Sequence, residues 1–318
     1  MIEDAQQMIT VFGGSGFIGR YVCEMLVKSG ARIRVASRKP RLSYFIQPLG
    51  QVGQIGYFRA DVTDRESVDR AVEEATAVVN LVGVLKGKFQ AIHVTGARNV
   101  AEAARDAGAG ALVHLSAIGA DPQSQSAYGR SKGDGETAVR DGFASASLFR
   151  PSLVFGPEDQ ITNRLAGLAR LPVLPVIAGQ CRFQPVFVRD LAQAISAATL
   201  DPGQYGGKLF EVGGPQVMTM RELHVAILQA SGQSTDLVNV PDFMASLLSR
   251  LGFLPGAPLT RDQWLMLQAD NVPAKGAPGL DAFGIKPTPL GAVAFDWLGR
   301  FHKGGRFAGR RLNLTATS

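Results

Sequence analysis

The chain has 318 residues, of which 46% are hydrophobic, and a formal net charge of +6 at neutral pH. This apolar fraction excludes disorder over most of the length, and glycines and prolines without a period exclude a collagen-like chain. Two cysteines, Cys23 and Cys181, are too few for a disulfide framework and suit a reducing compartment.

The first half of the chain alternates short apolar runs with helical patterns. Strands are expected at 8–12, 32–36, 55–58, 78–82, 111–115 and 146–149, and helices at 17–29, 65–74, 92–107 and 128–140. Strands separated by helical segments of ten or more residues need crossover connections, which makes the sheet parallel. The predicted fold class is therefore α/β, a doubly wound Rossmann sheet whose ligands bind beyond the carboxyl ends of the strands.

After about residue 156 the alternation becomes irregular because prolines interrupt the pattern. A helix at 191–200, a strand at 208–212 and a helix at 220–231 are expected before further proline-broken apolar stretches. We expect residues 1–156 to form the dinucleotide-binding core. Residues 157–318 are expected to complete that core and to add a smaller, mostly helical cap with a basic tail.

Three glycines follow the first strand directly and open the first helix. Gly13 permits a tight turn, Gly16 lets the backbone approach a pyrophosphate, and Gly19 allows the helix to pack close to the strand. The amide groups at the helix N-terminus attract an anion. An ordinary strand–helix turn is the alternative, but the position at the start of a long βαβ series favours nucleotide binding.

The end of the second strand indicates which dinucleotide binds. An acidic residue there is typical of NAD sites, but this chain has Ser37, Arg38 and Lys39. A guanidinium group matches a 2′-phosphate, and Arg20 offers a second cation. The sequence therefore favours NADPH, with NADH less favoured. The alternative is that Arg38 and Lys39 are solvated loop charges.

The expected cofactor-binding residues follow the carboxyl ends of the strands. They are Gly13, Ser15, Gly16, Phe17, Ile18, Gly19 and Arg20, then Ser37, Arg38, Lys39, Asp61, Val62, Leu81, Val82 and Gly83, with Tyr128 and Lys132 on the helix after the fifth strand.

A second set of residues is suited to proton transfer. Ser116 ends the fifth strand, and Tyr128 and Lys132 lie four residues apart on one face of the next helix. A lysine ammonium one turn away favours the tyrosine phenolate, and Ser116 can hydrogen-bond a carbonyl oxygen. We expect these three to be the catalytic residues of a carbonyl reduction or alcohol oxidation in which a nicotinamide carries the hydride.

These motifs resemble the short-chain dehydrogenase/reductase superfamily. Residues 150–157 resemble the R-P-x-x-V-x-G-P segment of its extended branch, which includes epimerases and dehydratases, and residues 186–190 resemble its V-x-V-x-D stretch. The resemblance implies that the first of these segments, with Pro151, lies against the nicotinamide.

A narrower resemblance covers residues 8–292. Residues 10–22, 113–117 and 132–136, and above all residues 278–290, are similar to the nucleotide-binding accessory subunit of respiratory complex I. That family implies tight NADPH binding, a peripheral place on the arm of complex I near the membrane, and a role in stability or assembly without established turnover. Because Ser116, Tyr128 and Lys132 are all present, the alternative of a free-standing oxidoreductase, epimerase or dehydratase stays open.

Two segments are candidates for contact with a membrane or a partner. Residues 243–254 place Phe243, Leu247, Leu251 and Leu254 on one helical face, which suits either packing against the core or docking on a partner or lipid. The C-terminal tail is basic and favours an anionic membrane surface or another acidic partner, although a solvated tail explains it equally.

The remaining expectations concern location and ligands. No stretch has the roughly 18 apolar residues needed to cross a bilayer, and the N-terminus does not resemble a signal peptide. We expect a cytoplasmic protein, peripheral on the inner membrane of a bacterium or on the matrix side of a mitochondrion. No metal site is expected, because the four histidines show no ligand spacing. No nucleic-acid partner is expected.

Overall fold

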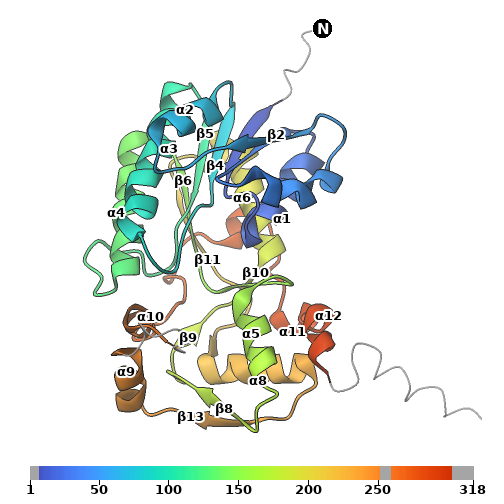
Figure 1. The fold of residues 1–318 in the computed structure, drawn as a ribbon, viewed down its shortest axis with the longest axis vertical. Coiled ribbons are helices and arrows are strands. Elements are labelled where there is room, and N and C mark those ends of the chain that lie inside the picture. The colour runs from blue at the N-terminus through green and yellow to red at the C-terminus, as the bar shows by residue number, and fades with distance from the viewer. Residues whose placement is uncertain (1–6, 251–258, 303–318) are drawn as a thin grey trace, which may run out of the picture. The chain divides into compact units, whose positions relative to one another are not determined.

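The computed structural model describes residues 7–250 and 259–302 (Figure 1). The chain divides into two compact units. The first unit consists of Met1–Pro151, Val188–Val212 and Pro273–Lys286. The second consists of Ser152–Phe187, Gly213–Val272 and Pro287–Ser318. The chain therefore leaves the first unit and returns to it twice.

A seven-stranded parallel sheet forms the centre of the first unit. Its order is β11-β6-β5-β4-β1-β2-β3. The strands are β1 (Met8–Phe12), β2 (Arg32–Ser37), β3 (Ile55–Arg59), β4 (Ala77–Asn80), β5 (Ala111–Leu115), β6 (Ser147–Pro151) and β11 (Leu209–Val212). The strand order reverses at β1, which lies between β2 and β4, and ligands of doubly wound sheets bind at such a reversal. The predicted Rossmann fold is confirmed.

Helices of the first unit connect these strands. They are α1 (Phe17–Lys28), α2 (Arg65–Val72), α3 (Gly96–Asp106), α4 (Ala127–Gly142), α6 (Val188–Leu200) and α7 (Pro202–Tyr205), with 3-10 helices η1 (Pro40–Leu49) and η3 (Leu280–Phe283). The predicted helix at 92–107 is instead a π-helical turn, η2 (Gln90–Thr95), followed by α3. The sequence did not predict η1, because Pro40 and Pro48 suggest a loop.

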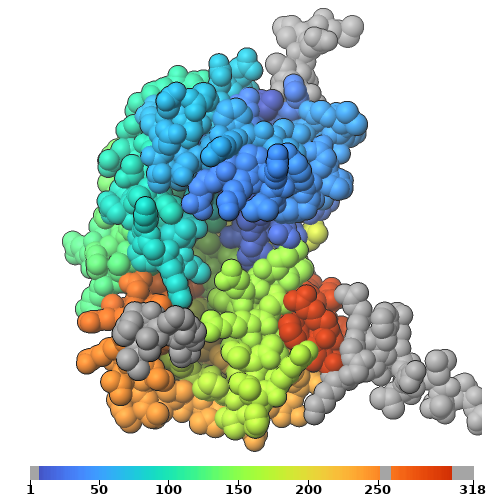
Figure 2. Space-filling view, viewed as in Figure 1, coloured from blue at the N-terminus to red at the C-terminus, as the bar shows by residue number. Residues whose placement is uncertain are grey.

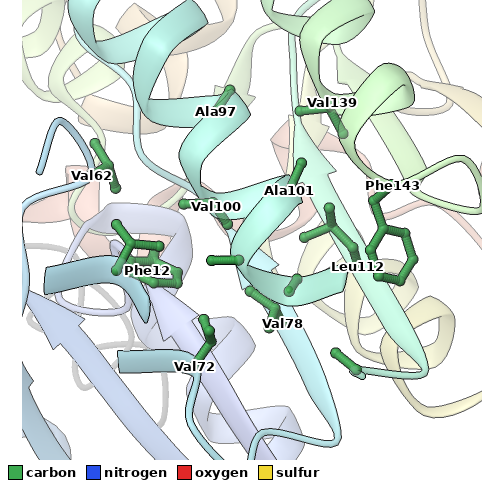
Figure 3. Packing of buried hydrophobic residues seen from close by; sticks show 14 of the residues in the cluster. Phe12, Val62, Val72, Val78, Ala97, Val100, Ala101, Leu112, Val139 and Phe143 are labelled. Carbon is green, nitrogen blue, oxygen red and sulfur yellow. The ribbon is translucent and has the colours of Figure 1, made fainter. Parts of the chain in front are cut away.

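An apolar cluster fills the space between the sheet and the helices α2, α3 and α4 (Figure 3). Phe12 and Val78 come from the sheet, and Val100 and Val139 come from the helices above it. Alanines fill the α3 face of the cluster, which lets the helix approach the sheet closely. On the other face α1 and α6 pack side by side. The sheet is thus covered on both faces, as its continuous apolar strands require.

The second unit is built from short elements. Its strand pairs join β7 (Val154–Phe155) to β10 (Val186–Phe187), β9 (Arg182–Phe183) to β12 (Met218–Thr219), and β8 (Val173–Val176) to β13 (Asp236–Asn239). Its helices are α5 (Gln160–Leu168), α8 (Met220–Ser231), α9 (Asp242–Arg250), α10 (Arg261–Met266), α11 (Leu290–Val293), α12 (Phe295–Leu298) and η4 (Gly299–Phe301). Phe155, Leu223, Ile227 and Trp297 are buried in its core.

The helix α9 presents an apolar face to solvent. The side chains of Phe243 and Leu247 are 74% and 61% exposed, while Ala245 and Ser249 are buried. Leu251 and Leu254, which were predicted to continue this face, lie outside the described residues. In the described ranges, no helix has the length and apolar character needed to span a membrane.

Candidate nucleotide-binding and proton-transfer site

The predicted phosphate turn lies between β1 and α1, at the reversal of strand order. Gly13 has a φ of +79°, and the Gly16 amide donates to the Gly13 carbonyl oxygen over 2.9 Å. A Cβ at Gly19 would lie 2.2 Å from that same oxygen, so the start of α1 fits only glycine there. A Cβ at Gly16 would meet only the Gly13 oxygen, at 3.1 Å, and would otherwise project into open space.

The first turn of α1 is suited to an anion. Gly16 caps the helix and supplies no side-chain oxygen, and the first turn has no acidic residue. The leading amide groups therefore keep their partial positive charge for a ligand. The next loop closes one side of the turn, because a Cβ at Gly13 would lie 3.2 Å from the Leu81 carbonyl carbon.

The ends of β2 and β3 bring together the residues predicted for the adenosine half. Ser37 ends β2 and Arg38 follows it, and the Ser37 hydroxyl lies 3.4 Å from that of Ser43. Asp61 follows β3 and accepts hydrogen bonds from the Thr63 amide and hydroxyl. These hydrogen bonds lower the pKa of Asp61, and the nearby charge of Arg38 adds to the effect. Arg38 itself is exposed.

The predicted proton-transfer residues lie at the carboxyl end of β5. The Lys132 ammonium is buried and donates to the Leu115 carbonyl oxygen over 2.7 Å, directly before Ser116. Burial lowers the pKa of Lys132 to about 8, partly offset by the charge of Glu136. Ser116 is only 4% exposed, and its hydroxyl has no hydrogen-bond partner within the described part of the chain. A buried donor without a partner is costly unless a ligand satisfies it.

Tyr128 begins the same helix and packs against His93. The two rings meet edge to face at 5.5 Å, and Phe89 stacks on His93 and also meets Tyr128 edge to face at 5.9 Å. His93 Nε2 accepts from the Val84 amide over 3.0 Å, so Nδ1 carries the proton and donates to the Ser131 hydroxyl over 2.8 Å. His93 thereby links the loop after β4 to the helix that carries Tyr128.

A buried ion pair supports the far side of this helix. Arg150, at the end of β6, donates to both oxygens of Glu136 over 2.7 and 2.8 Å. The Glu136 side chain is 2% exposed. Arg150 also reaches Glu211 at 3.3 Å. Glu136 also lies 3.7 Å from Arg140 of the same helix.

The structure thus brings the predicted residues to one edge of the sheet. Val62 is buried beside α3, its carbonyl accepting from Asn99, and the Pro151 carbonyl accepts from the Ile118 amide over 3.1 Å. His93 was not among the residues predicted for the site. Its hydrogen bonds reach Val84 and Ser131, and no local pattern marks such a contact.

A nicotinamide dinucleotide fits this arrangement. The open space beside Gly16 suits a pyrophosphate. At the carboxyl end of β5, the buried Ser116 hydroxyl has a hydrogen bond to offer to a ligand. Among the described residues, no cluster of three or more His, Cys, Asp or Glu is arranged to hold a metal ion.

The model of the NAD dependent epimerase/dehydratase family matches residues 9–213. The chain belongs to this family. It is 31% identical over 300 residues to "NADH dehydrogenase [ubiquinone] 1 alpha subcomplex subunit 9, mitochondrial" of Rattus norvegicus, covering 92% of this chain and 79% of the relative. It is also 33% identical over 207 residues to a ceramide reductase of Caulobacter vibrioides, covering 64% of each chain.

A solved structure has the same fold. An NADPH-dependent quinone oxidoreductase from Escherichia coli, complexed with NADPH, superimposes with a TM-score of 0.73 over 90% of this chain and 98% of its own. The two are 20% identical. At this level of identity the likeness establishes the fold.

Proposed function

We propose that this protein is an NADP(H)-binding accessory subunit of respiratory complex I that supports the assembly or stability of the complex. The observation that supports nucleotide binding is the phosphate turn. Gly13 and Gly19 permit its close backbone packing, and Gly16 leaves space for a pyrophosphate at the α1 N-terminus. Preference for NADPH follows from Arg38 after β2, where no carboxylate is present to repel a 2′-phosphate.

Assignment to complex I is supported by relatives that match nearly the whole chain. The rat, mouse and slime-mould proteins that carry the complex I subunit name each align with 92% or more of it. The place proposed is peripheral, on the cytoplasmic face of a bacterial inner membrane or the matrix side of a mitochondrion. The basic tail beyond residue 302, proposed to contact anionic lipid, lies outside the described residues.

Co-purification from native membranes tests this assignment. We expect the untagged chain, released with a mild detergent, to migrate with NADH:ubiquinone oxidoreductase activity and to carry stoichiometric NADPH. Separation from that activity at every detergent concentration would remove the complex I assignment while leaving nucleotide binding untouched.

A reductase is the second candidate, and the buried Ser116 and Lys132 favour it. A desolvated lysine beside a serine without a partner is a costly arrangement, typical of catalytic sites. In this reaction Ser116 donates a hydrogen bond to the carbonyl oxygen of the substrate and Tyr128 transfers a proton to it, while the Lys132 ammonium stabilises the resulting phenolate. A bound NADPH supplies the hydride that reduces the carbonyl carbon.

Removing the Tyr128 hydroxyl distinguishes the reductase from an accessory subunit without turnover. Tyr128→Phe is expected to remove reduction of long-chain ketones, the class suggested by relatives named ceramide reductase and 2-alkyl-3-oxoalkanoate reductase. NADPH retention is expected to change little. Two results argue against turnover at this site. In one, the Tyr128→Phe variant oxidises NADPH as fast as the wild type; in the other, the wild type oxidises no NADPH with any ketone of the panel.

A further inference from the structure

Positive charge is concentrated in one stretch of the first unit. Residues 25–60 contain seven lysines and arginines and no acidic residue, whereas the whole chain has a net charge of only +6. The nearest acids on either side are Glu24, which is paired with Lys28 and Arg189, and Asp61, which is bonded to Thr63. Besides the basic C-terminal tail, β2, η1 and β3, together with the end of α1, therefore carry a stretch of uncompensated positive charge.

The same stretch exposes large apolar side chains. Leu42 is 67% exposed, Phe45 47% and Val52 fully exposed, and Leu49 is also exposed. Leu42 and Phe45 are three residues apart in the 3-10 helix η1, so they project on the same side. Figure 2 shows the stretch, coloured blue, as a broad surface of the first unit. Exposed apolar groups gathered among cations are typical of a contact surface.

This surface is held in a fixed shape. Ile46 is fully buried beneath η1, and Tyr44 packs edge to face on Tyr57 of β3 at 5.0 Å. The Arg20 guanidinium lies 4.6 Å from the centre of the Phe45 ring. The outward side chains are thus presented by an anchored element.

Cations and apolar groups share one hollow at the end of this surface. A hollow of about 780 Å³ is lined by Lys28 and Arg32 together with Leu49 and Val52. The 3-10 helix η1 connects the carboxyl end of β2 to the amino end of β3, so it runs from the nucleotide edge of the sheet back to this hollow.

We propose that Arg32, Arg41, Leu42, Phe45, Leu49 and Val52, which we call the basic–apolar surface, bind an anionic lipid membrane. Basic residues are attracted to anionic headgroups, and apolar side chains among them enter the boundary between headgroups and acyl chains. The apolar face of α9 lacks this charge, because the helix itself carries one acid and one base, Asp242 and Arg250. The assignment does not depend on which nucleotide binds or on complex I.

Vesicle sedimentation with the full-length protein tests the proposal. We expect the protein to bind phosphatidylcholine vesicles that contain phosphatidylglycerol, to bind pure phosphatidylcholine weakly, and to dissociate at high salt. Arg32→Gln combined with Arg41→Gln is expected to weaken partitioning about 20-fold, since each cation near the surface contributes severalfold. Leu42→Ser combined with Val52→Ser is expected to weaken binding to the same vesicles in a salt-independent manner.

Matched controls come from the second unit. Arg164→Gln removes an exposed cation of α5, and Leu247→Ser removes an exposed apolar group of α9. Both are expected to bind vesicles like the wild type, and retained NADPH shows that each variant is folded. Equal binding to neutral and anionic vesicles, or loss of binding in Leu247→Ser but not in the variants of the basic–apolar surface, overturns the proposal. If the wild type does not bind vesicles and the arginine variant loses its association with complex I, the surface binds an acidic protein instead, and the membrane proposal is overturned.

Discussion

The two units bury their polar groups in different ways. In the second unit, buried Asp159 is satisfied within its own turn by the amides of Gly156 and Thr162, and the Arg182–Asp270 pair is exposed. In the first unit, buried charges from distant segments meet at the carboxyl ends of the strands, as Lys132 does with Leu115 and Glu136 with Arg150. A local cap stabilises the fold, whereas buried charged side chains that come together from separate elements are typical of catalytic and binding sites.

The phosphate turn offers the largest expected effect. Gly16→Val places a branched side chain at the proposed pyrophosphate position, so we expect NADPH affinity to fall more than about 100-fold, or 2.7 kcal/mol. The folded state should persist, since a Cβ at Gly16 contacts only the Gly13 oxygen. Titration of nicotinamide fluorescence measures this. Gly291→Val in the second unit, where a Cβ contacts nothing within 4 Å, is the control and should bind normally. Normal affinity in Gly16→Val excludes this turn as the nucleotide site.

Removing one ion pair from each unit compares a buried pair with an exposed one. Glu136→Gln leaves Arg150 without its buried bidentate partner, so we expect the free energy of unfolding to fall by about 3 kcal/mol in urea titrations. Asp270→Asn breaks the exposed pair with Arg182 and should change stability little. Equal losses in the two variants would show that burial does not distinguish these pairs.

The proposed preference for NADPH over NADH rests on Arg38. Arg38→Gln is expected to weaken the binding of NADPH by about 1.5 to 3 kcal/mol, because a charge-assisted hydrogen bond is lost. The binding of NADH is expected to change little. Arg41→Gln removes a neighbouring exposed cation and should preserve the preference. If both variants lose NADPH affinity equally, general positive charge rather than a specific bond selects the phosphate.

A pH dependence gives the smallest expected effect. Burial, with the charge of Lys132, lowers the pKa of His93 to about 4. Its ordinary value is near 6.5, so between these values the unfolded chain binds a proton that the folded chain does not, and stability is lost as pH falls.

We expect this one histidine to cost about 0.7 kcal/mol between pH 7 and pH 6, and His93→Gln to remove that slope in urea unfolding. Ser131→Ala removes the hydrogen-bond partner but not the titrating group, so it should keep the slope. An unchanged slope in His93→Gln contradicts the assignment.

The sequence predicted the first unit better than the second for a physical reason. Strands β1 and β5 have the predicted bounds because their apolar periodicity is local and ends at clear breaks. In the second unit helix α8 also has the predicted bounds, but the short strand pairs β7–β10, β9–β12 and β8–β13 were not predicted. The site positions could be proposed because parallel strands end at one edge. The contacts of His93 and the pairing of Glu136 with Arg150 join residues 9 to 38 positions apart, so only the folded chain reveals them. The 3-10 helix η1 follows no helical period, and its prolines suggest a loop.

The central claim is that the first unit binds a 2′-phosphorylated nicotinamide dinucleotide. Dissociation constants for NADPH and NADH, measured side by side on nucleotide-free full-length protein, test it most directly. We predict that NADPH binds at least about ten-fold more tightly, equivalent to 1.4 kcal/mol. Equal affinities, or a preference for NADH, would contradict the account.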